Sequence, residues 1–243
     1  MVFANQYKQV LKFQVFRIVG SIAVFTIVQI IISLGIAIGF TYLYSDVDQQ
    51  SILYLATGAP TIVLIMTGLV ILPNQISNAR IEGHGEFLRT LPVNRAAIIM
   101  ADSTIWLLVT IPGIVISTLA TNFIFQPGFH ISFWFIPAYL LCALTCIGVG
   151  YGFSYAMPPM LAMALSQVIA FMALMFSPIN FPMSRLPAWL QVVHTILPID
   201  AMAQIMRASL AVSSFEVNSL TVIKAIVWCI VGYGTSIAIL NKK

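Results

Sequence analysis

Few residues of this chain combine the types and spacing that enzymatic chemistry requires. Two of the three cysteines, Cys142 and Cys146, stand four residues apart in an apolar run, with no histidine or carboxylate close in sequence. A metal site needs more ligands at short spacing, so we interpret the cysteines as packing residues and expect no metal site. The histidines His84, His130 and His194 lie at or outside the edges of the apolar runs. We therefore expect no catalytic residues.

Two tetrapeptides match the core of the potassium-channel filter, because residues 149–152 and 231–234 both read Val-Gly-Tyr-Gly. A filter strand must follow a short pore helix in a re-entrant loop, whereas both matches lie within long apolar runs and neither follows a threonine. Close helix packing through small residues explains them better. The pairs with the required spacing are Gly148 with Gly152 and Gly232 with Ser236.

The composition excludes an ordinary soluble domain. Hydrophobic residues make up 60% of the chain and charged residues 7%, and the mean hydropathy is +1.00, whereas about a quarter of a soluble domain is charged. A membrane span needs roughly 20 apolar residues, so 243 residues leave room for about six spans. The sequence predicts an all-α polytopic membrane protein. No basic patch interleaved with aromatic residues is present, so we expect no nucleic-acid partner.

The predicted spans carry no group that could couple uphill transport to an energy source. Asp102 lies at the mouth of the third span, where we expect an interfacial carboxylate, and Lys224 lies in the outer part of the last span, where it can reach the interface. A P-loop needs Gly-Lys followed by Ser or Thr, and no lysine here follows a glycine. Any driving force must therefore come from a partner, and the chain itself is not expected to be an enzyme.

Apolar runs define the predicted spans and one interfacial helix. Residues 1–16 place apolar side chains on one side and Lys8 and Lys12 on the other, a pattern typical of an amphipathic helix at the membrane surface. The apolar members are Phe3, Tyr7, Val10 and Leu11. The spans are predicted at 18–44, 52–77, 95–125, 131–155, 160–177 and 217–240, with Asn94 as the N-cap of the third.

The segment 178–216 has a different pattern, because four prolines divide it into pieces too short to cross a membrane. Two short amphipathic helices are predicted within it, one around Trp189 and one around Met206. With Arg185, Trp189 and Arg207 able to sit at headgroup level, we predict a re-entrant helical hairpin on one side of the bilayer.

The distribution of basic residues predicts the orientation. In a six-span arrangement, eight of them fall on one side, which is cytoplasmic by the positive-inside rule. These residues are Lys8, Lys12, Arg17, Arg80, Arg89, Arg95, Lys242 and Lys243. Both termini and the loop between the second and third spans would then be cytoplasmic, and the hairpin would be extracellular.

The loop at 78–95 is the main polar interruption in the first half of the chain. A short helix is predicted from Glu86 to Leu91, since Pro92 stops it. Phe87, Leu88 and Leu91 share one face of this helix, whereas Glu86 and Arg89 point elsewhere. Such a helix suits either the lipid surface or a groove in another protein.

Residues 86–95 and 181–190, followed by Leu197-Pro198 and Arg207, resemble the permease subunit of type-2 ABC exporters. The first motif resembles the cytoplasmic coupling helix of that family, and the second resembles its extracellular re-entrant hairpin. The resemblance implies that the permease dimerises, as a homodimer, and binds two separate ABC ATPase subunits. It implies that this chain holds no cofactor and that ATP and Mg are bound by the ATPase. It also implies that the complex lies in a bacterial or archaeal plasma membrane. The coupling residues it implies are Glu86, Phe87, Leu88, Arg89 and Leu91.

The predicted substrate path follows the fifth span, which carries aromatic and methionine side chains that suit apolar or amphipathic cargo such as drugs or peptides. Its residues are Gln167, Phe171, Met172, Met175, Phe176 and Asn180. Export of a lipid-linked glycan or a lipid is the alternative within the same family. A passive channel or a membrane scaffold is the alternative from another class.

Overall fold

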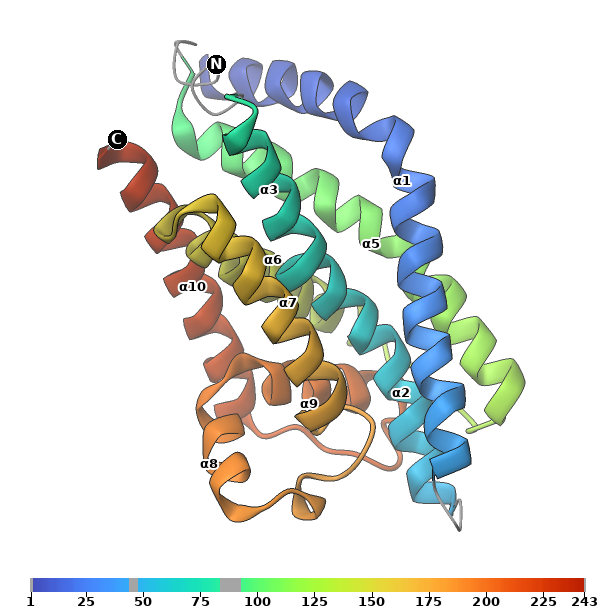
Figure 1. The fold of residues 1–243 in the computed structure, drawn as a ribbon. Coiled ribbons are helices and arrows are strands. Elements are labelled where there is room, and N and C mark those ends of the chain that lie inside the picture. The colour runs from blue at the N-terminus through green and yellow to red at the C-terminus, as the bar shows by residue number, and fades with distance from the viewer. Residues whose placement is uncertain (1, 44–47, 84–92, 243) are drawn as a thin grey trace.

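The computed structural model describes residues 2–43, 48–83 and 93–242, and within these ranges the chain is a bundle of helices (Figure 1). Among the described residues, six helices or joined helices are long and apolar enough to span a membrane, as the sequence predicts. The elements are α1 (Val2–Leu43), α2 (Gln49–Met66), η1 (Thr67–Ile71), α3 (Leu72–Ile81), α5 (Arg95–Phe125), α6 (Phe135–Ala156), α7 (Pro159–Phe176), η2 (Met183–Arg185), α8 (Ala188–Ile196), α9 (Pro198–Leu210) and α10 (Ser219–Lys242).

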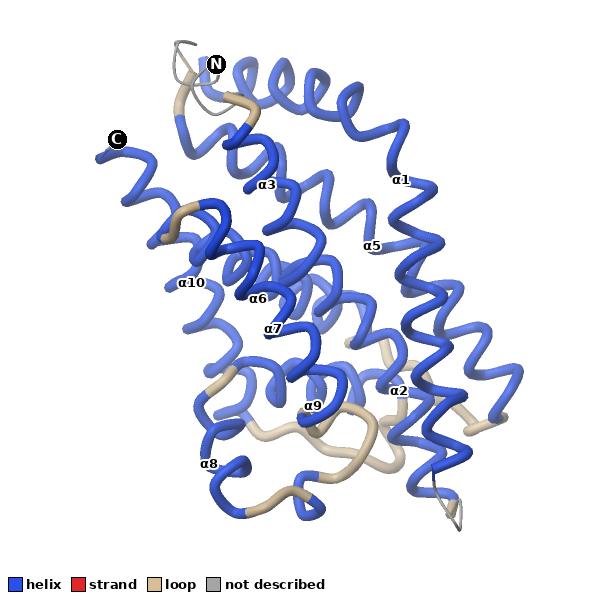
Figure 2. The backbone as a smooth tube through the Cα atoms, viewed as in Figure 1, coloured by secondary structure: helices blue, strands red, loops and turns tan. Residues whose placement is uncertain are grey.

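The two ends of the bundle carry different parts of the chain. Both described termini, the end of α3 and the start of α5 lie at one end, whereas α8, α9 and the start of α2 lie at the other (Figure 1). Figure 2 shows most of the loops gathered at the α8–α9 end. The first part of α1 runs across the terminal end before the helix turns down the bundle (Figure 1). The predicted interface helix and the first span are thus one helix.

A central helix is formed by α2, η1 and α3, which follow one another without a break from Gln49 to Ile81. Within its most apolar window 89% of the residues are buried, against 17% in the corresponding windows of α1, α7 and α10. It packs against α1, α5, α6, α7 and α9. This helix therefore forms the core of the bundle and connects its two ends.

Local chemistry explains the shape of this central helix. Asp48 caps its start by accepting a hydrogen bond from the Ser51 N–H at 2.9 Å. η1 is a π-helical segment, and the Leu72 N–H closes its turn by donating to the Thr67 carbonyl five residues back. Pro73 follows directly and has no N–H to offer to the preceding turn.

Glycines set the spacing of α6 from two neighbours. A Cβ atom at Gly150 would collide with the carbonyl oxygen of Gly68 in η1, and one at Gly232 in α10 would collide with the backbone of Gly148. The two Val-Gly-Tyr-Gly sequences therefore lie within helices that pack closely, which confirms the packing interpretation and excludes a filter strand at these positions.

Candidate functional site

The predicted coupling helix, with Glu86, Phe87, Leu88, Arg89 and Leu91, lies outside the described residues. The structure places the helices on either side of it. α3 ends at Ile81, and α5 begins at Arg95 after Asn94, whose side chain accepts a hydrogen bond from the Ala96 N–H at 2.9 Å. The predicted N-cap is confirmed.

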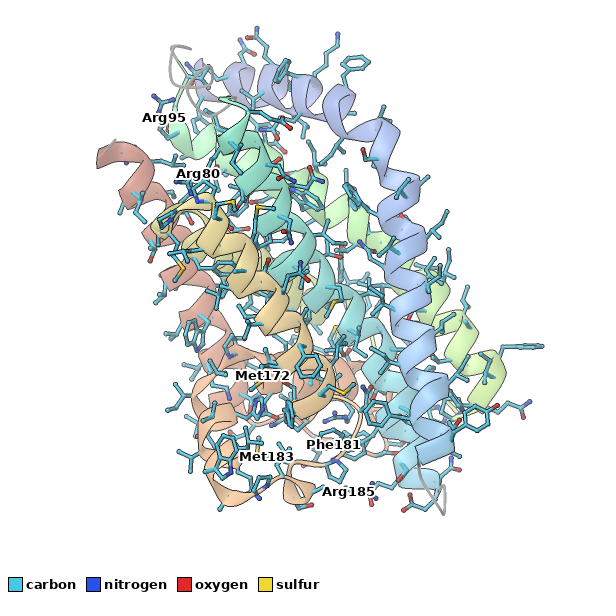
Figure 3. The ribbon with its side chains drawn as sticks, viewed as in Figure 1. Arg80, Arg95, Met172, Phe181, Met183 and Arg185 are labelled. Atoms are coloured by element: carbon cyan, nitrogen blue, oxygen red, sulfur yellow. The ribbon has the colours of Figure 1, made fainter. Side chains whose placement is uncertain are left out.

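Arg80 ties the end of α3 to the turn between α6 and α7. Its guanidinium donates to the carbonyl oxygens of Ser154 and Met157, the latter at 2.8 Å. These carbonyls belong to the last turn of α6 and its C-cap, which have no partner within the helix. Figure 3 shows Arg80 and Arg95 at the end of the bundle where both described termini lie.

The first part of α1 is tied to the start of α5. The hydroxyl groups of Tyr7 and Thr104 lie 2.9 Å apart, and Val10 packs against Ile98 and Ala101. Lys8 is exposed. The predicted apolar face of the interface helix is therefore partly covered by protein, and its position on the lipid surface stays a prediction.

The α8–α9 end is built around Arg207 of α9. Only 5% of this residue is exposed. Its Nη2 donates to the carbonyl oxygens of Pro178 and Ile179, at 3.2 and 3.0 Å, and its guanidinium lies over the rings of Tyr54 and Phe215, at 4.1 and 5.4 Å from their centres. Arg207 is thus enclosed by protein, and its predicted place at headgroup level stays a prediction.

Arg207 keeps its charge in this setting. Burial lowers the pKa of its guanidinium to about 10, so the group is a cation at neutral pH. Two carbonyl dipoles and two aromatic faces replace the water that the cation loses. The contact joins α9 to the segment after α7 and to the start of α2.

Lys224 and Trp228 of α10 hold the other side of the hairpin. Lys224 Nζ lies 3.7 Å from Asp200 Oδ2 and donates to the Thr195 carbonyl at 3.1 Å, and Trp228 Nε1 donates to the Ile196 carbonyl at 2.9 Å. These carbonyls lie in the last turn of α8, which needs outside donors. Lys224 caps a helix and pairs with a carboxylate, and its predicted reach to the membrane interface stays a prediction.

The structure brings together only some of the residues of the predicted substrate path. Gln167, Phe171, Met172, Met175 and Phe176 are all exposed on α7, with Phe171 62% exposed. Asn180 is 1% exposed and lies against the backbone position of Gly58 in α2. The α7 residues thus form one exposed surface, and Asn180 does not belong to it.

A pocket of about 230 Å³ lies between α7, α8, α9 and α10. Of the predicted path residues only Met172 lines it. Figure 3 shows Met172 between the middle of the bundle and the hairpin, where Phe181, Met183 and Arg185 lie. The complete lining is Leu69, Val149, Val168, Ile169, Met172, Ser177, Leu190, Val193, His194, Leu197, Pro198, Ile199 and Trp228.

A buried polar cluster that the sequence does not predict lies near the terminal end. Asp102 of α5 is 8% exposed and accepts a hydrogen bond from the hydroxyl of Tyr151 in α6. Tyr233 of α10 donates to Ser103 of α5 at 3.0 Å. Asp102 thus contacts a neighbouring helix, and its predicted place at the membrane interface stays a prediction. Its place in an otherwise apolar run was the one available signal.

Two of the three thiols pack in the core. Cys142 and Cys146 are buried, and Cys146 Sγ lies 3.2 Å from the Sδ of Met202 in α9. Within residues 2–43, 48–83 and 93–242, no group of three or more His, Cys, Asp or Glu side chains could hold a metal ion.

Comparison with known proteins assigns the family. No curated protein sequence matches the chain. A family model described as ABC-2 type transporter matches residues 5–211. The match runs from the start of α1 to the end of α9 and leaves α10 outside. The chain therefore belongs to the ABC-2 type transporter family, as a multi-pass membrane permease.

Proposed function

We propose that the chain is the permease subunit of an ATP-driven exporter, in which two copies form a homodimer with two separate ATPase subunits. The family match over residues 5–211 carries this proposal, since it includes both the predicted coupling loop and the hairpin. No lysine of the chain follows a glycine, so no P-loop is present. ATP and Mg would be held by the partner.

The central helix supplies a physical route for coupling. It starts beside the hairpin, where Tyr54 stacks with Arg207, and it ends at Ile81, next to the loop that would meet the ATPase. Closure of the ATPase on ATP would displace this loop, and α2, η1 and α3 would carry the displacement to the outer end. Phe87, Leu88 and Leu91 would fill the partner groove, with Glu86 and Arg89 at its rim.

The exposed surface of α7 supports an apolar or amphipathic cargo. Phe171, Met172, Met175 and Phe176 leave their side chains on the outside of the single chain, where a second copy would face them across a shared path. Methionine and aromatic side chains adapt to varied apolar ligands. A lipid-linked glycan would need a wider, more polar channel, so this surface favours drug-like or peptide cargo.

Co-expression with the ATPase subunit of the same transporter tests the proposal. We expect the two proteins to co-purify in equal amounts and to hydrolyse ATP, because the chain has no ATP site of its own. A passive channel or a scaffold would purify alone. Purification without a stoichiometric ATPase from intact membranes would contradict the proposal.

Cross-linking tests the homodimer. A Phe171→Cys variant is expected to form a dimer in native membranes when treated with a bis-maleimide, whose spacer can cross the shared path, whereas Leu119→Cys, an exposed position on α5, is not. The native cysteines are replaced by alanine in both variants, so that each carries one thiol. A dimer formed at Leu119 and not at Phe171 would place the second copy on another face.

Labelling with a membrane-impermeant maleimide tests the orientation. Ser213 lies at the hairpin end and Glu82 lies at the terminal end, and both are exposed. We expect Ser213→Cys to react in intact cells and Glu82→Cys to react only after the membrane is permeabilised. The reverse result would invert the proposed cytoplasmic placement of the termini.

A further inference from the structure

The two Val-Gly-Tyr-Gly sequences, one in α6 and one in α10, place their tyrosines beside each other. The centres of the Tyr151 and Tyr233 rings lie 6.2 Å apart. Tyr151 donates its hydroxyl to the carboxyl group of Asp102, and Tyr233 donates to Oγ of Ser103 at 3.0 Å. The two acceptors are consecutive residues of α5, so both tyrosines bind the same turn of that helix. We call these four residues the tyrosine cluster.

The tyrosine cluster joins α5 to two helices that pack closely against each other. A Cβ atom at Gly232 of α10 would collide with the backbone of Gly148 in α6, and one at Gly148 would lie 2.9 Å from the ring of Tyr233. The glycines thus let the two helices touch and also leave room for the tyrosine. Because closely packed segments transmit displacement rather than absorb it, α6 and α10 should move together.

A third tyrosine adds to the contact between α5 and α6. The hydroxyl of Tyr139 in α6 donates to the Leu107 carbonyl at 2.6 Å and lies 2.8 Å from Thr110 Oγ1. Together with the tyrosine cluster, it binds α5 over residues 102–110. Displacing α5 by itself would break these hydrogen bonds in apolar surroundings, where the freed groups find no water.

This assembly reaches from the predicted coupling loop to the hairpin. α5 begins at Arg95, directly after the loop. At the other end, Lys224 and Trp228 of α10 donate to backbone carbonyls in the last turn of α8. A continuous line of contacts therefore runs from the loop through α5, the tyrosine cluster and α10 to α8. The central helix follows a different line, because it meets the hairpin at Arg207 in α9.

We infer that Tyr151 and Tyr233 are positioning residues of the transport cycle, which make α5, α6 and α10 move as one unit and transmit the displacement of the coupling loop to α8. The inference rests on the proposed function, since an ATPase partner must displace the loop. The central helix transmits the same displacement to α9. The two helices of the hairpin therefore receive it through separate contacts, and loss of the tyrosine cluster should affect α8 alone.

Hydrogen exchange of the full chain in complex with its ATPase tests the inference without a known cargo. Exchange is compared without nucleotide and with ADP-vanadate, which holds the ATPase closed. In the wild type we expect the exchange rates of residues 188–196 and 198–210 both to change about fivefold. The variant Ser103→Ala/Tyr233→Phe removes both partners of one hydrogen bond, so neither is left unsatisfied and the fold should be retained. In this variant α8 should lose the response and α9 should keep it.

Two further variants complete the comparison. Tyr151→Phe removes the other hydrogen bond of the tyrosine cluster and should also abolish the α8 response. Tyr7→Phe is the matched control, because its hydroxyl lies 2.9 Å from Oγ1 of Thr104, the next residue of α5, but connects that helix to α1. We expect both helices of the hairpin to respond normally in this control.

The possible failures are distinguishable. If α8 responds normally in both cluster variants of a complex that hydrolyses ATP, the inference is overturned and the proposed permease function stands. Loss of the response in α8 and α9 together would also overturn it, since the tyrosine cluster would then support the whole bundle. A wild-type chain that binds no ATPase would contradict the proposed function, and the inference with it.

Discussion

The guanidinium of Arg207 lies 4.1 Å from the centre of the Tyr54 ring. The two residues lie far apart in the sequence, Tyr54 at the start of the central helix and Arg207 in the second helix of the hairpin. Because the same guanidinium also binds the carbonyls of Pro178 and Ile179, one side chain joins three segments. The hairpin is therefore fixed to the central helix by a buried cation.

Replacing Arg207 should destabilise the protein strongly. Arg207→Ala removes two charge-assisted hydrogen bonds and the stacking on Tyr54 and leaves two carbonyls without donors, which we expect to cost about 2–4 kcal/mol. Thermal unfolding of the purified chain measures this loss. Arg185→Ala on the same hairpin is the control, since Arg185 is exposed and its loss should change stability by about 0.5 kcal/mol or less. Equal effects of the two changes would contradict the assignment.

The contribution of Arg207 should not depend on pH in the ordinary range. Burial lowers its pKa from 12.5 to about 10, so the unfolded chain binds more protons than the folded chain only between those two values, where stability from this group rises with pH. Below pH 9 the group is charged in both states. The melting-temperature difference between wild type and Arg207→Met is expected to stay constant from about pH 5 to 9. If this melting-temperature difference changes with pH within that interval, another titratable group controls the contact.

The close contact between η1 and α6 should tolerate no side chain. Gly150→Ala places a methyl group against the Gly68 carbonyl, and we expect a loss of about 1–3 kcal/mol in stability from the forced separation of the helices. Gly234→Ala is the matched control from the second Val-Gly-Tyr-Gly sequence, because a Cβ there meets no atom within 4 Å. Thermal unfolding of both variants compares them, and an unaffected Gly150→Ala would show that the helices can move apart freely.

Lys224 should stabilise the end of α8 rather than the whole bundle. Lys224→Met removes the pairing with Asp200 and the bond to the Thr195 carbonyl, a change we expect to cost about 1 kcal/mol because Lys224 is partly exposed. Hydrogen exchange of residues 188–196 should quicken about fivefold. Glu216→Gln, an exposed charge at the same end, serves as the control. Exchange that quickens throughout the bundle would argue against a local cap.

Variants that uncouple transport from ATP hydrolysis test the predicted coupling helix. Leu88→Ala truncates its predicted apolar face and Arg89→Glu reverses a predicted rim charge, so both should insert normally yet lower the cargo moved per ATP hydrolysed by about tenfold. The measurement is paired transport and ATPase assay in vesicles. Lys8→Glu, an exposed charge at the same end, should keep the ratio. A normal ratio in both coupling variants would remove these residues from the ATPase interface.

The sequence predicts the spans well because apolar length and helix stops are local properties. The Asn94 cap and the two short helices of the hairpin follow from residues that lie next to one another in the chain. The environments of Arg207 and Asp102 do not, because a single sequence indicates roughly how deep a residue lies but not which distant side chain meets it. Tyr54 and Tyr151, which contact these two residues, carry no local signal of that role.

The π-helical segment places one extra residue in the central helix. A π turn holds one more residue than the α turn it replaces, so losing a single residue between Thr67 and Ile71 would preserve the phase of α3, with Asn74 still facing Ser166 and Arg80 still facing Met157. A deletion within α3 would instead rotate everything beyond it by roughly 100°. Conversion of this turn to α-helix without the loss of a residue would likewise rotate α3 relative to α2 by roughly 100° and shift it by about one residue rise, roughly 1.5 Å. The helix that connects the two ends of the bundle thus contains one turn from which a residue can be lost without changing the packing on either side.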